Sequence, residues 1–210
     1  MFALVKREIR DHVIYIIVAA TLSTILIIAL ITIAYHEGPQ IAEWIPEEPI
    51  IPFFALTMLG FCAMGVSQMY MDRTRRISAF VSTLSVTRTQ ILLARIITGM
   101  LTILVLFVPL IVTLVILLRS FGPPIPMYAG TLFDISTTAL LITFACYCLG
   151  LLTGWSPNKV TPTLGALVLT CILVPLVMIK GFGWEIVVIL LIFIAASLIR
   201  TWHAFTSQSL

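Results

Sequence analysis

Long apolar runs alternate with short polar segments along the whole chain. A helix needs about 20 apolar residues to cross the roughly 30 Å hydrocarbon core of a bilayer, and the runs have lengths close to this. We therefore predict an all-α membrane protein in which residues 1–210 form a single transmembrane domain. The six predicted spans are 13–34, 50–71, 90–118, 128–152, 161–179 and 184–199.

The residues before the first apolar run have the pattern of a short amphipathic helix, with an apolar face and basic residues around the rest. This stretch is too short and too charged to cross a membrane, so we predict an interfacial helix whose basic residues face anionic head groups. A frayed positive N-terminus is the alternative. No small-residue cleavage site follows the next apolar run, so we expect a retained helix rather than a signal peptide. The residues of the interfacial helix are Phe2, Val5, Lys6, Arg7, Ile9 and Arg10.

Residues 72–95, between the second and third predicted spans, are polar but regularly patterned. Apolar residues recur at helical spacing from position 77 to position 84, which predicts a short amphipathic helix. Thr87 and Gln90 then form a Thr-x-x-Gln capping box directly before the next apolar run, which predicts that a new helix starts there. The four apolar positions are Ile77, Phe80, Val81 and Leu84.

The other polar segments predict where helices stop. Residues 35–49 contain three prolines and predict a loop after the first span. Residues 200–210 predict a short tail. Within the second span, Gly60 and Gly65 lack side chains, so we expect a neighbouring helix to approach closely there.

The composition supports a membrane protein. Hydrophobic residues make up 60% of the chain and charged residues only 10%, whereas a soluble domain has about 25% charged residues. Too few charges are present to cover a water-facing surface, and no segment is long enough to form a separate soluble domain.

The basic residues are distributed unequally between the two sides that six spans would create. Ten of the 12 Lys and Arg residues fall on the side that holds both termini, and only Arg119 and Lys180 fall on the other. By the positive-inside rule, both termini are predicted to be cytoplasmic. The ten are Lys6, Arg7, Arg10, Arg73, Arg75, Arg76, Arg88, Arg95, Lys159 and Arg200.

Catalytic motifs are missing from the sequence. It has no phosphate-binding Gly-rich loop, no His-Glu-x-x-His and no Gly-x-Ser-x-Gly. The three histidines are predicted on both sides of the membrane, so they cannot form one metal site. We expect no catalytic residues, no metal and no nucleic-acid partner. The four cysteines lie within apolar runs, where we interpret them as packing residues.

Three charged residues lie within or beside the predicted spans. Asp134 is a candidate for a substrate or ion pathway because a carboxylate at membrane depth is costly. The alternatives are a hydrated interface residue and a hydrogen bond that pairs two helices. Glu185 suits the N-terminal turn of a helix, where the helix dipole favours negative charge. Arg95 lies one turn into the third span and could extend back to the cytoplasmic interface.

Residues 72–95 resemble the cytoplasmic loop of the permease subunits of type-2 ABC exporters. In that family the loop reads as an acid, a basic patch, and then Leu-Leu-Ser-x-Pro-x-Ser-Arg-x-x-Ile-Leu-x-x-Lys. Here Asp72 is followed by Arg75 and Arg76 and then by Val-Ser-Thr-Leu-Ser-Val-Thr-Arg-Thr-Gln-Ile-Leu-Leu-Ala-Arg. This sequence lacks the turn proline and has Asp for the usual Glu and Arg95 for the usual Lys.

The resemblance implies a six-span permease, not itself an enzyme, in a prokaryotic cytoplasmic membrane. Its loop helix would be a coupling helix that docks on separate ABC ATPase subunits, which bind ATP and Mg²⁺. Two permease subunits, identical or related, would form the path. The alternatives are a haem-exporter-like permease of cytochrome maturation, a membrane scaffold or an intramembrane enzyme. The implied docking residues are Arg73, Arg75, Arg76, Ile77, Phe80, Val81, Leu84 and Arg88.

Overall fold

The computed structural model describes residues 2–37, 47–75, 87–121, 127–154, 168 and 184–207. These residues form helices throughout, as the apolar runs predict. Four of the helices, α2, α5, α6 and α8, are long and apolar enough to cross a membrane, so the chain is a multi-pass helical membrane protein. The helices are α1 (Phe2–Asp11), α2 (Val13–Glu37), α3 (Glu47–Arg75), α5 (Arg88–Phe121), α6 (Met127–Gly154) and α8 (Trp184–Ser207).

The other two of the six predicted spans are not among these four candidate membrane-spanning helices. The second predicted span corresponds to α3, which has 29 residues; among the residues of α3 whose side chains the structure describes, the apolar stretch is Ala55–Tyr70. The predicted span 161–179 and the predicted amphipathic helix 77–84 lie outside the described residues, apart from Val168.

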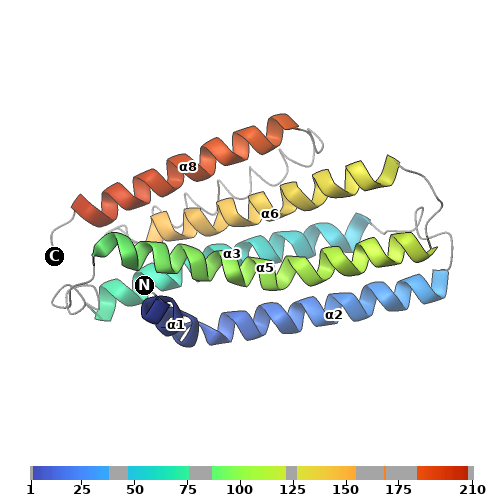
Figure 1. Ribbon diagram of the computed structural model, residues 1–210, viewed down its shortest axis with the longest axis horizontal. Coiled ribbons are helices and arrows are strands. Elements are labelled where there is room, and N and C mark those ends of the chain that lie inside the picture. The colour runs from blue at the N-terminus through green and yellow to red at the C-terminus, as the bar shows by residue number, and fades with distance from the viewer. Residues whose placement is uncertain are drawn as a thin grey trace.

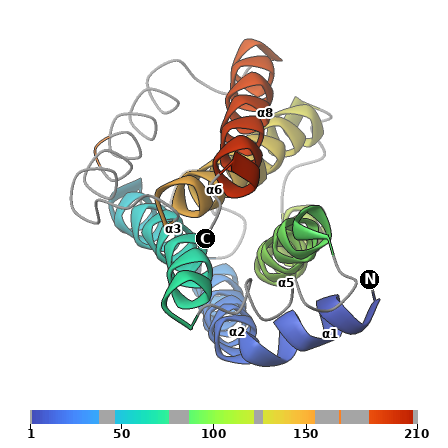
Figure 2. The same cartoon turned by 90° about the vertical axis from the view of Figure 1, so that its left-hand side faces the viewer.

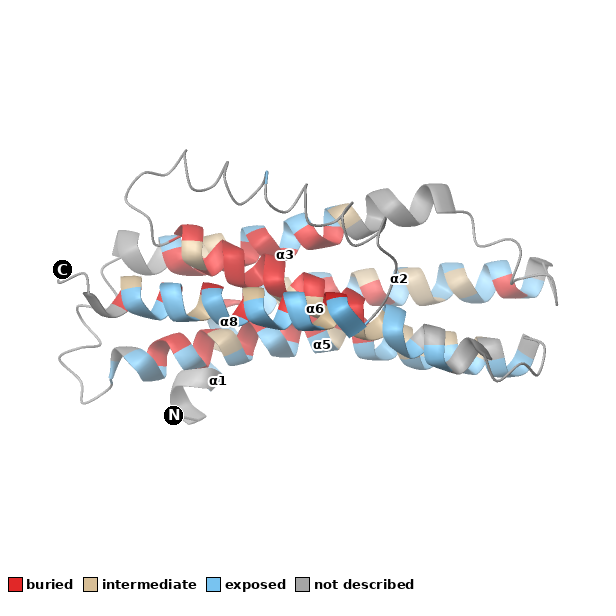
Figure 3. Cartoon of the chain, turned by 90° about the horizontal axis from the view of Figure 1, so that it is seen from above, coloured by how far each residue is buried: buried red, intermediate tan, exposed pale blue. Residues whose placement is uncertain are grey.

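The long helices run side by side, and α1 is turned across one end of them (Figures 1 and 2). Helix α6 packs against α3 and α8, while α2 packs against α5 and α1 also contacts α5. Helix α6 is the most buried of the four long helices, and Figure 3 shows the buried residues gathered where α3 and α6 meet. The last turns of α3, α6 and α8 lie at the same end as α1 (Figure 1).

Glycines allow α3 and α6 to come into backbone contact. A Cβ atom on Gly65 of α3 would lie 2.6 Å from the carbonyl oxygen of Tyr147, and one on Gly150 of α6 would collide with the carbonyl oxygen of Cys62. Gly154 is equally restricted, since its Cβ would lie 2.7 Å from Val66 O. The predicted close approach is therefore confirmed at Gly65. It is wrong at Gly60 as far as the described residues go, since none of them lies within 4 Å of its Cβ position and Gly60 is exposed.

The predicted start of the third span is confirmed. Helix α5 begins at Arg88, and the Thr87 N–H donates to Gln90 Oε1 over 3.3 Å, which is one half of a capping box. The Thr87 carbonyl oxygen accepts the first helical hydrogen bonds, from Gln90 N and Ile91 N. This helix end is therefore encoded locally.

Several helices extend a few residues beyond their predicted spans, and two of these extensions have a clear physical reason. Helix α3 begins at Glu47, inside the predicted loop 35–49, because proline is tolerated in the first turn of a helix, where its missing N–H has no helical acceptor. Helix α8 continues through the predicted tail to Ser207. Its last turns bury Thr201 and Phe205, so packing against the bundle extends the helix beyond the apolar run.

Candidate functional site: a buried polar cluster

Helix α1 places a carboxylate against the bundle. Glu8 lies on the side of α1 that faces α5, and its side chain is only 17% exposed. One carboxylate oxygen lies 3.6 Å from Arg95 Nε of α5, and the other lies 3.4 Å from Nε2 of His12, one turn along the chain. Both separations are longer than an ordinary charge-assisted hydrogen bond. The contact with Arg95 is therefore primarily an ion pair, and the contact with His12 is one only when the imidazole is protonated.

Arg95 is the centre of the cluster. Its side chain is 4% exposed, and Nη1 donates to Met69 Sδ of α3 over 3.2 Å. The prediction that this arginine extends back to the aqueous interface is therefore wrong. The reason is that α1 supplies a carboxylate at the right place, so the guanidinium is compensated inside the protein. Arg95 lies about 10 Å along the axis from the first residue of α5, at 1.5 Å per residue.

Tyr147 of α6 belongs to the same cluster. Its hydroxyl lies 2.7 Å from Gln68 Oε1 of α3 and 2.8 Å from the backbone carbonyl oxygen of Arg95. The ring occupies the space beside Gly99 of α5, where a Cβ atom would collide with it. Because Tyr147 is fully buried, these contacts hold α3, α5 and α6 together away from water.

The Tyr147 hydroxyl has a single proton, and this determines which way the side-chain amide of Gln68 is turned. A hydroxyl has one proton, so it cannot donate to both oxygens at once. The Gln68 Nε2 atom is buried without a hydrogen-bond partner. If the amide is turned over, Nε2 donates to the hydroxyl and the hydroxyl donates to the Arg95 carbonyl, so the hydroxyl proton and one of the two Nε2 protons are used. We therefore interpret Gln68 as the donor of this pair.

The electrostatics of the cluster favour an ionised Glu8. Burial alone raises the pKa of Glu8, but the contact with His12 and the positive charge of Arg95 together outweigh burial. The pKa of Glu8 is therefore held below its ordinary value of 4.5. Losing one partner of a buried ion pair costs about 3–5 kcal/mol, because the other charge is then left without compensation.

A second hydrogen bond fixes the start of α2. The Tyr15 hydroxyl lies 2.8 Å from Ser67 Oγ, which itself donates to the carbonyl oxygen of Met64. Since the only proton of Ser67 is used in this way, Tyr15 is the donor. Helix α2 is thus attached to α3 immediately after the break in helical geometry at His12.

The predicted docking residues fall largely outside the described part of the chain. Arg73 and Arg75 lie in the last turn of α3, and Arg88 is the first residue of α5, although the positions of these side chains are not among those described. Arg76, Ile77, Phe80, Val81 and Leu84 lie outside the described residues. The docking prediction therefore remains a prediction.

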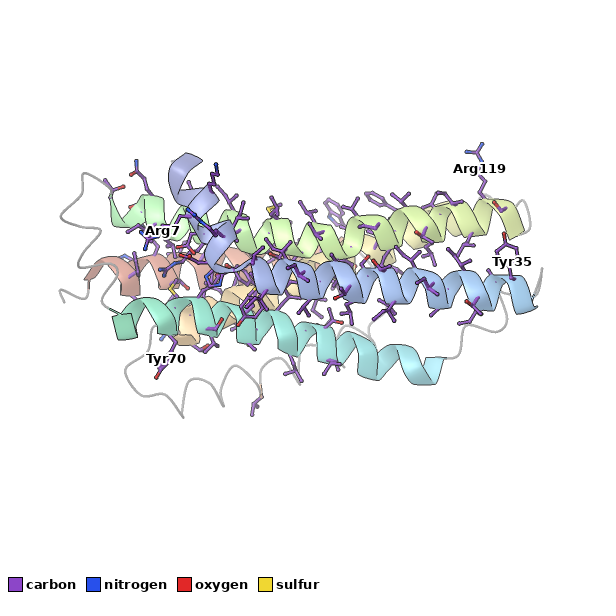
Figure 4. The ribbon with its side chains drawn as sticks, turned by 90° about the horizontal axis from the view of Figure 1, so that it is seen from below. Arg7, Tyr35, Tyr70 and Arg119 are labelled. Carbon is purple, nitrogen blue, oxygen red and sulfur yellow. The ribbon has the colours of Figure 1, made fainter. Side chains whose placement is uncertain are left out.

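The predicted interfacial residues form α1, as expected for a helix. Lys6, Arg7 and Arg10 are exposed, and Ile9 is half-buried. The side chains of Phe2 and Val5 are outside the described set. Figure 4 shows Arg7 and Arg119 at opposite ends of the molecule, as the charge distribution predicts.

The candidate pathway residue Asp134 is not part of the cluster. It is exposed on α6, between the exposed residues Phe133 and Ile135, toward the end at which α6 begins. The structure does not bring it near Arg95, and its role remains a prediction. Glu185 lies in the first turn of α8, as predicted from the helix dipole.

The sequence analysis missed most of the cluster. Glu8 was hidden in a basic N-terminal stretch, and Gln68 and Tyr147 stood as single polar residues inside apolar runs. A usable signal exists, since a polar or charged side chain within a membrane helix is costly unless it meets a partner. Arg95 and Gln68 carry that signal, but sequence alone does not say which residues meet them.

The arrangement is suited to holding helices together, since its contacts join α1, α3, α5 and α6. Within the described residues, no group of three or more His, Cys, Asp and Glu side chains could hold a metal ion. No protein-family model matches the chain, and no curated protein or solved structure matches it. What the fold and the cluster establish is a multi-pass helical membrane protein whose N-terminal helix is fixed to its bundle by a buried ion pair.

Proposed function

We propose that this chain is the membrane-spanning subunit of a type-2 ABC exporter, with six spans and cytoplasmic termini. One structural observation carries the proposal. The N-terminal helix α1 lies across the bundle end at which residues 76–86 connect α3 to α5, and it is paired with α5 by Glu8 and Arg95. An exporter subunit needs both features at its cytoplasmic face, where movement of a partner must reach the spans.

The proposed mechanism assigns ATP hydrolysis to separate subunits that bind ATP and Mg²⁺. Their docking element would be the predicted helix 77–84, whose apolar residues would fit a groove on the partner, with arginines on either side. Two permease subunits would enclose the path. Closure of the ATPases would then move the loop, the start of α5 and α1 together, and so tilt the spans.

The first test is to purify the tagged chain gently from its native membrane and to measure ATP hydrolysis in the preparation. We expect a soluble ATPase subunit to be purified with the chain. Phe80→Asp and Arg76→Glu should each remove most of the bound ATPase while leaving the amount of membrane-inserted chain unchanged. Lys159→Glu is the matched control, because it makes the same change of charge in the other predicted cytoplasmic loop.

Either of two results would contradict the proposal. One is a single purified chain that hydrolyses no ATP, which would favour a scaffold or, if that chain had an activity of its own, an intramembrane enzyme. The other is an ATPase that stays bound in both loop variants, which would place the docking surface elsewhere.

A further inference from the structure

We propose that Glu8 and Arg95 form a latch that holds α1 against α5 and that opens about a hinge at His12. The name "Glu8–Arg95 latch" is used below for this ion pair. Its consequence for transport rests on the proposed function, but its existence as a conformational device rests on the geometry alone.

The first argument is the way in which α1 is attached. Helix α1 contacts α5 far more than it contacts α2, its neighbour in the chain. The helical geometry breaks at His12, where Tyr15 N and Ile16 N both bond to the His12 carbonyl oxygen. Directly beyond this point, Tyr15 attaches α2 to Ser67 of α3. Helix α2 is therefore held in place by α3, and the break at His12 separates it from α1, which can move about that residue.

The second argument is the difference in solvent exposure between two ion pairs of α1, Arg7–Asp11 and Glu8–Arg95. Arg7 and Asp11 lie 3.7 Å apart with side chains 47% and 57% exposed, so water already solvates both charges. Glu8 and Arg95 are almost covered. An exposed pair contributes little to stability, whereas separation of a covered pair leaves a buried charge behind. The latch pair therefore decides whether α1 stays docked.

The third argument is that Arg95 contacts several helices at once. The Arg95 side chain contacts α1 and α3, and its backbone carbonyl accepts a hydrogen bond from Tyr147 of α6. This residue lies close to the start of α5, where residues 76–86 join the helix. A movement of α1 is thus passed to three helices through one turn of α5, and a movement of that turn is passed back to α1.

Hydrogen exchange on the full-length chain in lipid nanodiscs tests the latch. Glu8→Gln keeps the shape of the side chain and removes its charge. We expect the amides of residues 6–11, which have helical acceptors, to exchange about tenfold faster or more, because local opening of α1 becomes easier, while α6 and α8 exchange as before. Asp11→Asn is the matched control on the same helix, and it should change the exchange of α1 by no more than about twofold.

A double-mutant cycle shows whether the two residues act on each other. Arg95→Met should also accelerate exchange in α1, and the double variant Glu8→Gln/Arg95→Met should exchange more slowly than the product of the two single effects. Unchanged exchange of α1 in Glu8→Gln would overturn the latch. So would faster exchange in every helix, which would indicate a stabiliser of the whole bundle, and so would independent effects in the cycle.

The outcome for the latch is separable from the outcome for the proposed function. The exchange experiment needs no ATPase, so a preparation without an ATPase would remove the exporter proposal and leave the latch in place. Conversely, the exchange of α1 could be unchanged in Glu8→Gln while an ATPase is found to bind through residues 77–84. This result would remove the latch and leave the exporter proposal in place.

Discussion

Glu8 illustrates how a residue takes its properties from its surroundings. Two carboxylates lie three residues apart on α1, and Asp11 is exposed whereas Glu8 is covered by α5. The difference follows from the side of the helix on which each lies. Arg95 and His12 compensate the buried charge of Glu8 from two directions, so ionisation persists despite burial.

This environment predicts a stability that depends on pH. The pKa of Glu8 is lower in the folded chain than its ordinary value of 4.5, so its contribution is present above 4.5 and is lost as pH falls through the lower folded value. The charged and titratable groups facing Glu8 are His12 on α1, Arg95 on α5 and Tyr147 on α6. We expect the thermal midpoint of the detergent-solubilised chain to fall over this acidic range.

The control for this effect is Glu8→Gln, which removes the titrating group. Its thermal midpoint should be lower than that of the wild type at neutral pH and should change less on acidification. If both chains lost stability in parallel as the pH fell, other carboxyl groups would be responsible and the assignment to Glu8 would be wrong.

At the scale of elements, the α3–α6 pair shows how small residues bring two membrane helices together. Gly150 and Gly154 of α6 are four residues apart, so they lie on one face of the helix, and that face meets Gly65 of α3. In lipid, apolar side chains gain little from leaving the bilayer. Close packing of backbones therefore contributes more to helix association than apolar burial does.

Alanine substitutions should distinguish packed glycines from free ones. Gly150→Ala should destabilise the chain by about 1–3 kcal/mol, because the new Cβ meets the backbone of Cys62, which cannot move aside like a flexible side chain. Gly60→Ala should be neutral or stabilising by up to about 1 kcal/mol, since its site is open and alanine favours a helix. Thermal unfolding in detergent compares the two, and equal effects would refute the packing argument.

At the scale of the whole molecule, the helices are long relative to a bilayer. Helix α5 has 34 residues and so extends for about 51 Å, against a hydrocarbon core of about 30 Å. If α5 is centred in the membrane, about 10 Å of it projects on each side. Arg95 then lies at the edge of the hydrocarbon core. Helix α1 can therefore lie along the membrane surface while its Glu8 side chain contacts Arg95.

This arrangement predicts how the two ends of the molecule are exposed in a cell. Arg7→Cys should react with a membrane-impermeant maleimide only after the membrane is permeabilised, whereas Arg119→Cys should react in intact cells (Figure 4). The wild-type chain is the background control: Cys62, Cys146 and Cys148 are buried, and the same chain measures any labelling of Cys171, which lies outside the described residues. Labelling of both variants from the same side would contradict the predicted topology.

The local features of this protein were determined by the sequence itself. Apolar runs long enough to cross a membrane predicted helices α2, α5, α6 and α8, and the Thr87–Gln90 pattern predicted where α5 begins. These predictions succeed because helical hydrogen bonds and capping contacts join residues at most about four positions apart. The information they need is therefore contained in a short window of sequence.

Only the tertiary structure decided which distant residues meet. Glu8 and Arg95 are far apart in the chain, as are Gln68 and Tyr147, and their pairing depends on how each helix is rotated and on which neighbour covers it. The same is true of Gly65, which packs against α6, and of Gly60, which has no neighbour within 4 Å of its Cβ position among the described residues. A sequence pattern gives the face of a helix, but the partner of that face follows from packing of the whole bundle.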